Sequence, residues 1–319
     1  NAWMQTPRGY EMVTRNGMEV AKLTDPFAAF LTPRMPWMYV HMMNASVISV
    51  ALLVAGVSAY IVWKKPDTEA WNTALKLAVV LLIISAPFQA VHGDAYGRHV
   101  VDTQPQKFAA MEAHYETGQA DLHLLAFPKS PEALTDPRAE NLVTVSLPAV
   151  GSFLASGGDF DAEVIGLNEY EENPPVALVF WSFRFMVGLG FLFIGLALWG
   201  GFLTYRGRLA DSTRYLKAMI AASPFGYAAL LTGWYVTEIG RQPWVIQGEL
   251  KTSEAVSSTL TGAEATLTLV GFVVLYVGLM LTALYILKWL VREELRSLGV
   301  RESSGGRWHG PIPWVSSDD

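Results

Sequence analysis

The sequence contains no cysteine. This absence excludes a disulfide framework, an iron–sulfur cluster, a thiolate zinc site and the covalent CxxCH attachment of c-type haem. Any metal or haem must therefore be held by His, Met, Tyr or carboxylate side chains. Charge is also scarce, because only 16% of the 319 residues are charged, against about 25% in an average soluble domain. The net charge of −6 is too small to indicate a nucleic-acid partner.

Long apolar runs take the place of the missing charges. Hydrophobic residues make up 51% of the chain and the mean hydropathy is +0.27. About 20 consecutive apolar residues are enough to cross a bilayer. The sequence therefore predicts an all-α membrane protein with five transmembrane helices, two of which contain a proline that is expected to kink them, Pro87 and Pro224. The five predicted helices are 39–63, 71–91, 176–205, 216–236 and 267–290.

The charges in the connecting segments predict an orientation, because loops rich in Lys and Arg stay in the cytoplasm. The segment 206–217 has four basic residues and one acidic residue, whereas 92–175 has four basic and fourteen acidic residues. We therefore expect 206–217 inside and 92–175 outside, together with 237–266. The resulting division is an external segment 1–37, two helices in 38–91, an external loop 92–175, three helices in 176–290 and a cytoplasmic tail 291–319.

Polar residues inside a membrane are functional candidates, because a central charge costs about 2.5–3.5 kcal/mol on insertion scales. His41 lies just inside the first predicted helix. Its imidazole could bind haem iron, and an interfacial histidine bonded to backbone or water is an equal alternative. Met186 alone would usually fill a core. Arg184, two residues earlier, needs an anion in this apolar helix, and a haem propionate is one.

Glu238 ends the fourth predicted helix, next to Trp234 and Arg241. It could be a carboxylate ligand, with Arg241 neutralising a propionate. The alternative is a Glu238–Arg241 ion pair at the interface, with Trp234 in the aromatic belt. The predicted topology brings His41, Met186 and Glu238 to the outer half of the membrane.

The external loop 92–175 is long, and ordered loops of this length are usually functional. Its composition predicts a small folded cap with a helix near 107–117. Lys107 and Glu112 are five residues apart, which is about 140° around a helix. They would flank a small ligand rather than form one patch; the alternative is a solvated helix.

Six sequence blocks in order carry a family resemblance. They are WMQTP at 3–7, VH at 40–41, the block from GD to E at 93–112, VIGL at 164–167, FRFM at 183–186 and the block from GW to GRQPW at 233–244. With these blocks the chain resembles subunit I of cytochrome bd-type quinol oxidase. The GRQPW and QPxKxAAxE patterns are the specific ones.

The resemblance implies roles for the candidate residues. His41 and Met186 match the axial ligands of a low-spin haem b, a pair that tends to raise the haem potential, and Arg184 matches the arginine beside that haem. Lys107 and Glu112 match residues of the quinol site. Glu112 would accept a proton from a quinol hydroxyl and Lys107 would bind a head-group oxygen.

The same resemblance implies a dihaem oxygen-reducing centre. Glu238 matches the carboxylate ligand of a high-spin haem, and Trp234 and Arg241 match its surroundings. The implied cofactors are a low-spin haem b, a high-spin haem b, and either haem d or a third haem b. The implied partners are a second membrane subunit, quinol, oxygen and a small accessory subunit, with no nucleic acid.

The implied activity is oxidation of ubiquinol or menaquinol at the outer face of a prokaryotic cell membrane, with reduction of oxygen to water and a contribution to the proton-motive force in aerobic respiration. Members of the family have about four more helices before the first match. We therefore expect this chain, which starts at Asn1, to be part of a longer or split subunit with an incomplete oxygen-reducing centre.

Two alternatives stay open on the sequence. The first is a haem-b electron-transfer membrane subunit without oxygen chemistry. The second is a transporter with an external cap, which would more often show broken helices and an internal repeat; we find no repeat. The GRQPW block favours the oxidase.

Overall fold

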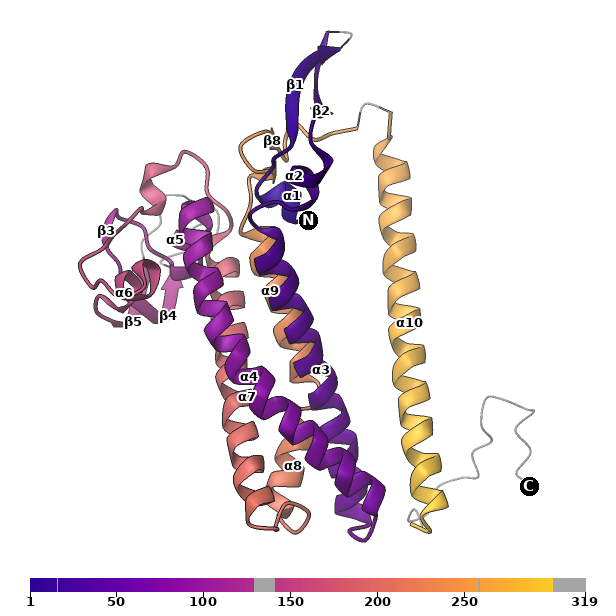
Figure 1. Cartoon of the computed structure of the whole chain (residues 1–319). Helices are drawn as coiled ribbons and strands as arrows, with labels where there is room; N and C mark the ends of the chain where they lie inside the picture. The colour runs from indigo at the N-terminus through magenta and orange to yellow at the C-terminus, as the bar shows by residue number, and fades with distance from the viewer. Residues whose placement is uncertain (16, 129–140, 258, 301–319) are drawn as a thin grey trace.

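The computed structural model describes residues 1–15, 17–128, 141–257 and 259–300. It is mostly helical, as predicted (Figure 1). Among the described residues, four segments are long and apolar enough to cross a membrane: Pro26–Lys64, Glu69–Thr103, Val176–Tyr205 and Gly262–Ser297. The helices are α1 (Ala2–Gln5), α2 (Pro26–Phe30), α3 (Met35–Lys64), α4 (Glu69–Thr103), α5 (Pro105–Glu112), α6 (Val150–Ser156), α7 (Val176–Tyr205), α8 (Thr213–Ala222), α9 (Phe225–Ile239) and α10 (Gly262–Ser297).

The described strands form small antiparallel pairs in the segments before and between the long helices. Each pair is an isolated two-stranded sheet. The pairs are β1 (Tyr10–Arg15) with β2 (Met18–Leu23), β3 (Gly118–Gln119) with β6 (Glu163–Val164), β4 (Leu122–Pro128) with β5 (Asn141–Leu147), and β7 (Trp244–Ile246) with β8 (Leu250–Lys251).

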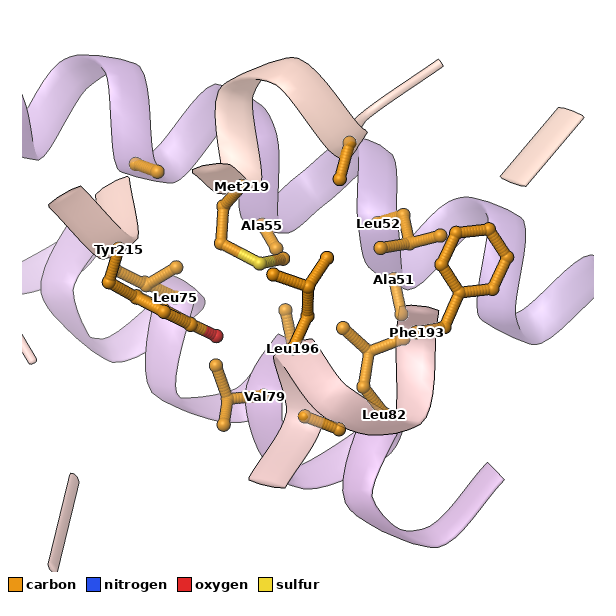
Figure 2. Packing of buried hydrophobic residues seen from close by; sticks show 14 of the residues in the cluster. Ala51, Leu52, Ala55, Leu75, Val79, Leu82, Phe193, Leu196, Tyr215 and Met219 are labelled. Carbon is orange, nitrogen blue, oxygen red and sulfur yellow. The ribbon is translucent and has the colours of Figure 1, made fainter. Parts of the chain in front are cut away.

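The apolar core lies between α3, α4, α7 and α8. Figure 2 shows Leu52, Leu82 and Phe193 meeting between their helices. Small residues such as Ala51 and Ala55 face this core, and small residues let membrane helices approach closely. The core is therefore built from apolar side chains packed on small ones.

The predicted fourth membrane helix, 216–236, is divided in two. α8 ends at Ala222 and α9 begins at Phe225, with Ser223 and Pro224 between them. Proline has no N–H to donate to the preceding turn and its ring clashes with that turn. Ser223 and Pro224 keep helical backbone angles, so the interruption is a kink, as predicted. The number of membrane crossings stays a prediction.

The predicted second helix, 71–91, is longer than expected. α4 runs to Thr103, with Pro87 inside it. The extension is stabilised by rings: Tyr96 stacks on Trp37 of α3 at 6.5 Å between centroids, and His99 stacks on the same indole at 5.7 Å. The first twelve residues of the predicted external loop therefore continue the helix.

α10 runs beside the other long helices and stands apart from them over most of its length (Figure 1). Its apolar window is entirely exposed. Near its C-terminal end, the indole nitrogen of Trp71 donates a 2.8 Å hydrogen bond to Glu294 Oε1. Of the predicted tail 291–319, the first residues belong to α10, and 301–319 lie outside the described residues.

The segments 1–34 and 241–251 meet at one end of the bundle, which we call the cap end; it also contains α5 and the ends of α4 and α9 (Figure 1). Gln5 is fully buried there, and its amide donates a 3.2 Å hydrogen bond to the carbonyl of Thr237. The backbone N–H of Gln247 donates to the carbonyl of Met4 at 2.9 Å. The polar N-terminal segment thus packs on the end of α9.

The loop after α4 folds into a small cap, as predicted, with α5, α6 and the strands β3 to β6. Its first helix is shorter than the predicted 107–117. α5 ends at Glu112 because Ala113 adopts a left-handed conformation with φ 51°, which an α-helix cannot continue.

Candidate functional site

His41 of α3 and Met186 of α7 lie at the same height in the bundle. α9 provides the first measure: a Cβ built on Gly226 would lie 2.7 Å from the Cα of Ser49, so these two positions touch. His41 is eight residues nearer the cap end than Ser49, and Gly233 is seven residues nearer than Gly226. These steps are about 12 Å and about 10 Å along a helix. A Cβ on Gly233 would lie 3.0 Å from the sulfur of Met186.

α4 and α7 give the same height independently. Gly200 of α7 packs on Val79 of α4, where an added Cβ would lie 3.0 Å from Val79 Cγ1. Met186 and Gly93 are each fourteen residues nearer the cap end, about 21 Å. A Cβ on Gly93 would lie 3.3 Å from Cε1 of His41. Both measures therefore place the two predicted haem ligands at one level.

The surroundings of these two side chains fit a haem. A neutral imidazole and a thioether are a known axial pair for haem iron. A glycine packs against each of them, Gly93 against His41 and Gly233 against Met186, where a larger residue would clash. Nδ1 of His41 is buried and has no hydrogen-bond partner in the described part of the chain. The donor set is therefore one that haem iron accepts, and the two glycines leave room for both side chains.

An aromatic cluster surrounds His41 on the side of the cap end. The rings of His92 and Tyr96, both on α4, lie 5.7 and 5.5 Å from the imidazole of His41, measured between centroids. Trp37 lies 5.5 Å from His92. The sequence reasoning did not select His92, Tyr96 or Trp37. Their spacing of four residues on each helix is the signal that could have found them.

Arg184 has an anionic partner inside the chain. One of its terminal nitrogens donates to Glu112 Oε2 in a buried ion pair. Its guanidinium also lies over the rings of Phe180 and Phe183, at 4.9 and 5.2 Å. Its burial therefore does not require a haem propionate, and that role stays a prediction. Burial raises the pKa of Glu112 above its ordinary value, and Arg184 opposes the rise.

Lys107 points to the opposite side of α5. It is 3% exposed, and its ammonium donates to the side-chain oxygens of Gln5 and Gln104 and to the carbonyl of Thr237. Burial lowers the pKa of Lys107 well below its usual range, and the charges of Arg34 and Arg241 lower it further. Lys107 and Glu112 are thus both buried, and they face different helices as their spacing predicts.

The two specific sequence patterns meet at this lysine. A Cβ built on Gly240, the first residue of GRQPW, would lie 3.1 Å from Cγ of Lys107. Glycine at this position therefore allows the QPxKxAAxE helix to approach the end of α9. Sequence reasoning identified both patterns but not their contact, because they are more than 120 residues apart.

Glu238 forms the ion pair with Arg241 that the sequence left open, with 2.7 Å between Oε2 and a guanidinium nitrogen. Its other oxygen accepts a hydrogen bond from the side chain of Asn1. The Glu238 side chain is 36% exposed, and Trp234 is half-buried one turn earlier. Within the described residues, no group of three or more His, Asp or Glu side chains could hold a metal ion.

Two buried residues of the cap end escaped the sequence reasoning. Arg34 donates to Thr103 Oγ1 at 3.0 Å and to Gln104 Oε1 at 2.6 Å. In the sequence, Arg34 could have been noticed as a basic residue that directly precedes a long apolar run. Gln104 stood inside a recognised sequence block but had no role assigned to it.

The comparisons with known proteins identify the family of the chain. Residues 1–295 match the family described as cytochrome bd terminal oxidase subunit I. The chain belongs to this family. Family membership also decides against the transporter.

Relatives and a solved structure show how far the likeness extends. The chain is 33% identical over 301 residues to cytochrome bd ubiquinol oxidase subunit 1 of Bacillus subtilis (strain 168), which covers 90% of this chain and 62% of the relative. It is 31% identical over 305 residues to a putative cytochrome bd menaquinol oxidase subunit I of the same organism, covering 92% of this chain and 65% of the relative.

The bd oxidase structure from Geobacillus thermodenitrificans matches with a TM-score of 0.77 and 29% identity, covering 92% of this chain and 65% of that one. The chain thus spans a little under two thirds of the length of these proteins.

Proposed function

We propose that this chain is the quinol-oxidising part of a cytochrome bd-type quinol:oxygen oxidoreductase, with the quinol site at the cap end. The observation that carries the proposal is the placement of Lys107 and Glu112 on α5. Both side chains are 3% exposed, and α5 joins the helix that faces His41 to the cap. The names of the relatives, ubiquinol oxidase and menaquinol oxidase, agree with a quinol substrate.

Glu112 is the proton acceptor in this proposal. A buried carboxyl whose pKa is raised holds a proton more firmly than an exposed one. In its ionised form it can take the proton of a quinol hydroxyl. Arg184 keeps the carboxylate oriented through their ion pair.

Lys107 binds the head group. Its ammonium is held by the side chains of Gln5 and Gln104. These two amides fix the position of the nitrogen and supply no charge of their own, so that the group can carry a positive charge when it binds an oxygen of the ligand. The surrounding protein excludes water, which strengthens this interaction.

His41 and Met186 would hold a low-spin haem b, which when bound supplies one-electron chemistry beside the quinol site. Glu238 would ligate a high-spin haem of the oxygen-reducing centre, with Arg241 and Trp234 beside it and haem d or a third haem b as the remaining cofactor. The partners would be a second subunit, quinol, oxygen and a small accessory subunit. The chain would lie in a prokaryotic cell membrane with 92–175 outside and would contribute to the proton-motive force.

A second candidate is a haem-b electron-transfer subunit without oxygen chemistry. One observation favours it: Glu238 is partly exposed and already paired with Arg241. The interface ion pair would then be its whole role. Substitution of Glu238 separates the two candidates.

The test of the quinol site compares oxygen uptake with two electron donors, quinol and an artificial donor, in the complete oxidase complex. Glu112→Gln should depress oxygen uptake with quinol, while an artificial donor that reduces the haems directly still supports uptake. Glu116→Gln is the matched control, because Glu116 is exposed in the same cap. An equal loss of oxygen uptake with both electron donors would assign Glu112 a structural role and contradict the proposal.

A further inference from the structure

Two buried cations at the cap end share a single neutral acceptor. A terminal nitrogen of Arg34 donates to Gln104 Oε1 at 2.6 Å, and the ammonium of Lys107 donates to the same oxygen at 2.7 Å. Arg34 is 1% exposed and Lys107 is 3% exposed. In the described ranges of the chain, neither cation forms an ion pair with a carboxylate.

This arrangement is unfavourable without an anion. Each buried charge loses its hydration, and the loss is repaid only where an opposite charge and further hydrogen bonds are supplied. The acceptors of the two cations are all neutral: the amide oxygens of Gln104 and Gln5, the hydroxyl of Thr103 and the carbonyl of Thr237. They supply hydrogen bonds but no opposite charge. Nε of Arg34 is also buried and lacks a partner among the described residues. Lys107 can relieve the repulsion by losing its proton, whereas the guanidinium of Arg34 stays charged. The unpaired donor and charge of Arg34 therefore indicate an anion that the described residues do not provide.

The position of Arg34 limits which anion this is. Arg34 precedes His41 by seven residues and has helical backbone angles at the start of α3, so that it lies two turns away on the same face. Its guanidinium lies 5.1 Å from the ring centroid of Tyr96, whose ring is 5.5 Å from that of His41. Arg34 thus lies between the proposed haem ligand and the proposed quinol lysine.

We propose that Arg34 and Lys107 form a two-cation site for an oxyanion, in which Arg34 binds the oxyanion between the quinol site and the haem site. The planar guanidinium fork suits a carboxylate or a quinol oxygen, whereas a neutral ligand would leave the charges unpaired. This chemistry has two sources: a haem propionate and a deprotonated quinol oxygen. The inference rests on the proposed function.

The experiment uses Arg34→Gln in the complete complex, with Arg98→Gln as the matched control. Arg98 is a partly exposed arginine of α4 that is paired with Asp94. Two quantities are measured: the midpoint potential of the low-spin haem by redox titration in membranes, and the KM for quinol.

A propionate source predicts a lower midpoint potential with an unchanged KM, because removal of a cation favours the oxidised haem. A quinol source predicts a KM raised about tenfold, which corresponds to 1.4 kcal/mol, with an unchanged potential. Either result supports the two-cation site and identifies its oxyanion.

Unchanged potential and KM in Arg34→Gln, with normal haem content, would overturn the inference, and so would an equal change in Arg98→Gln. If Arg34→Gln does not assemble, Arg34→Lys keeps the charge and loses the fork; a smaller change in the same quantity supports the site, and no change overturns it. A wild-type complex that does not oxidise quinol would instead overturn the proposed function.

Discussion

The same long helices have two different interiors. Away from the cap end, α3, α4 and α7 bury Leu, Ala, Val and Phe against one another (Figure 2). Towards the cap end, the chain buries Arg34, Lys107, Glu112 and an ion pair with Arg184. The first interior is what a membrane bundle needs for stability. The second is not, because buried ion pairs are often replaced by apolar residues with no loss of stability.

The difference teaches where to look for chemistry. Buried charge that does not stabilise the fold must be retained for another reason, and here it surrounds the level of His41 and Met186. We therefore expect changes at the cap end to alter cofactor content and turnover, and changes in the apolar interior to alter stability alone. Four experiments, taken from the largest expected effect to the smallest, test this division.

The largest effect is expected at His41. His41→Ala should abolish the low-spin haem band in reduced-minus-oxidised spectra of membranes, because the imidazole is the proposed ligand. The control is His92→Ala, since His92 lies only 5.7 Å from His41 between ring centroids. Loss of the band in His92→Ala with retention in His41→Ala would move the ligand to α4 and break the assignment.

Glu238 is the next test, and it separates the oxidase from the simple haem subunit. If Glu238 holds a high-spin haem, Glu238→Gln in the complete complex should lose that haem and oxygen reduction while the low-spin band persists. If Glu238 only pairs with Arg241, the haem content and oxygen reduction should both persist. Haem quantitation and oxygen uptake decide between them, with the exposed Glu254→Gln as control.

How much the sequence predicts differs between the two interiors. The apolar interior follows from hydrophobic runs alone, and the predicted helix Val176–Tyr205 matches α7 at both ends. The hydrophobic runs could not show that α4 continues to Thr103, since that extension is stabilised by stacking on the indole of Trp37, which belongs to another helix. They also could not show whether Pro224 kinks or breaks a helix, because neighbouring packing decides that outcome.

For the cap end, the sequence named some of the single residues but not the assembly that they form. The family resemblance supplied Lys107 and Glu112, and their spacing predicted that they diverge. The resemblance did not predict that Glu112 would take Arg184 as its partner, because no local pattern joins residues 72 positions apart. Arg34 was missed because a cation before an apolar run usually stays in water.

The apolar interior provides the third test, through a matched pair on α4. Leu82 is fully buried, whereas its neighbour Leu81 is 49% exposed. Leu82→Ala should lower the free energy of unfolding by about 2–5 kcal/mol, because it removes buried contacts and leaves a cavity. Leu81→Ala should cost much less. Thermal unfolding of the purified complex measures both, and a change in the low-spin haem spectrum of Leu82→Ala before unfolding would break the division between the two interiors.

The smallest effect is a shift in pH dependence at Glu112. Burial raises the pKa of this carboxyl and Arg184 opposes the rise. A base must lose its proton before it can accept one from quinol, so kcat/KM should rise as pH rises through the raised pKa. Stability should move the other way: the folded state binds this proton more tightly than the unfolded state, so the free energy of unfolding falls between the ordinary carboxyl pKa and the raised one.

The variant Arg184→Gln removes the opposing cation. The pKa of Glu112 should then rise further, and the ascending limb of kcat/KM against pH should move to higher pH. Arg184→Lys keeps the charge and should leave the limb near its wild-type position, while Glu112→Gln should abolish the limb. A limb that stays in place in Arg184→Gln, or that persists in Glu112→Gln, would show that another group accepts the proton. The buried charges of the cap end would then need a different explanation from the one that separates them from the apolar interior.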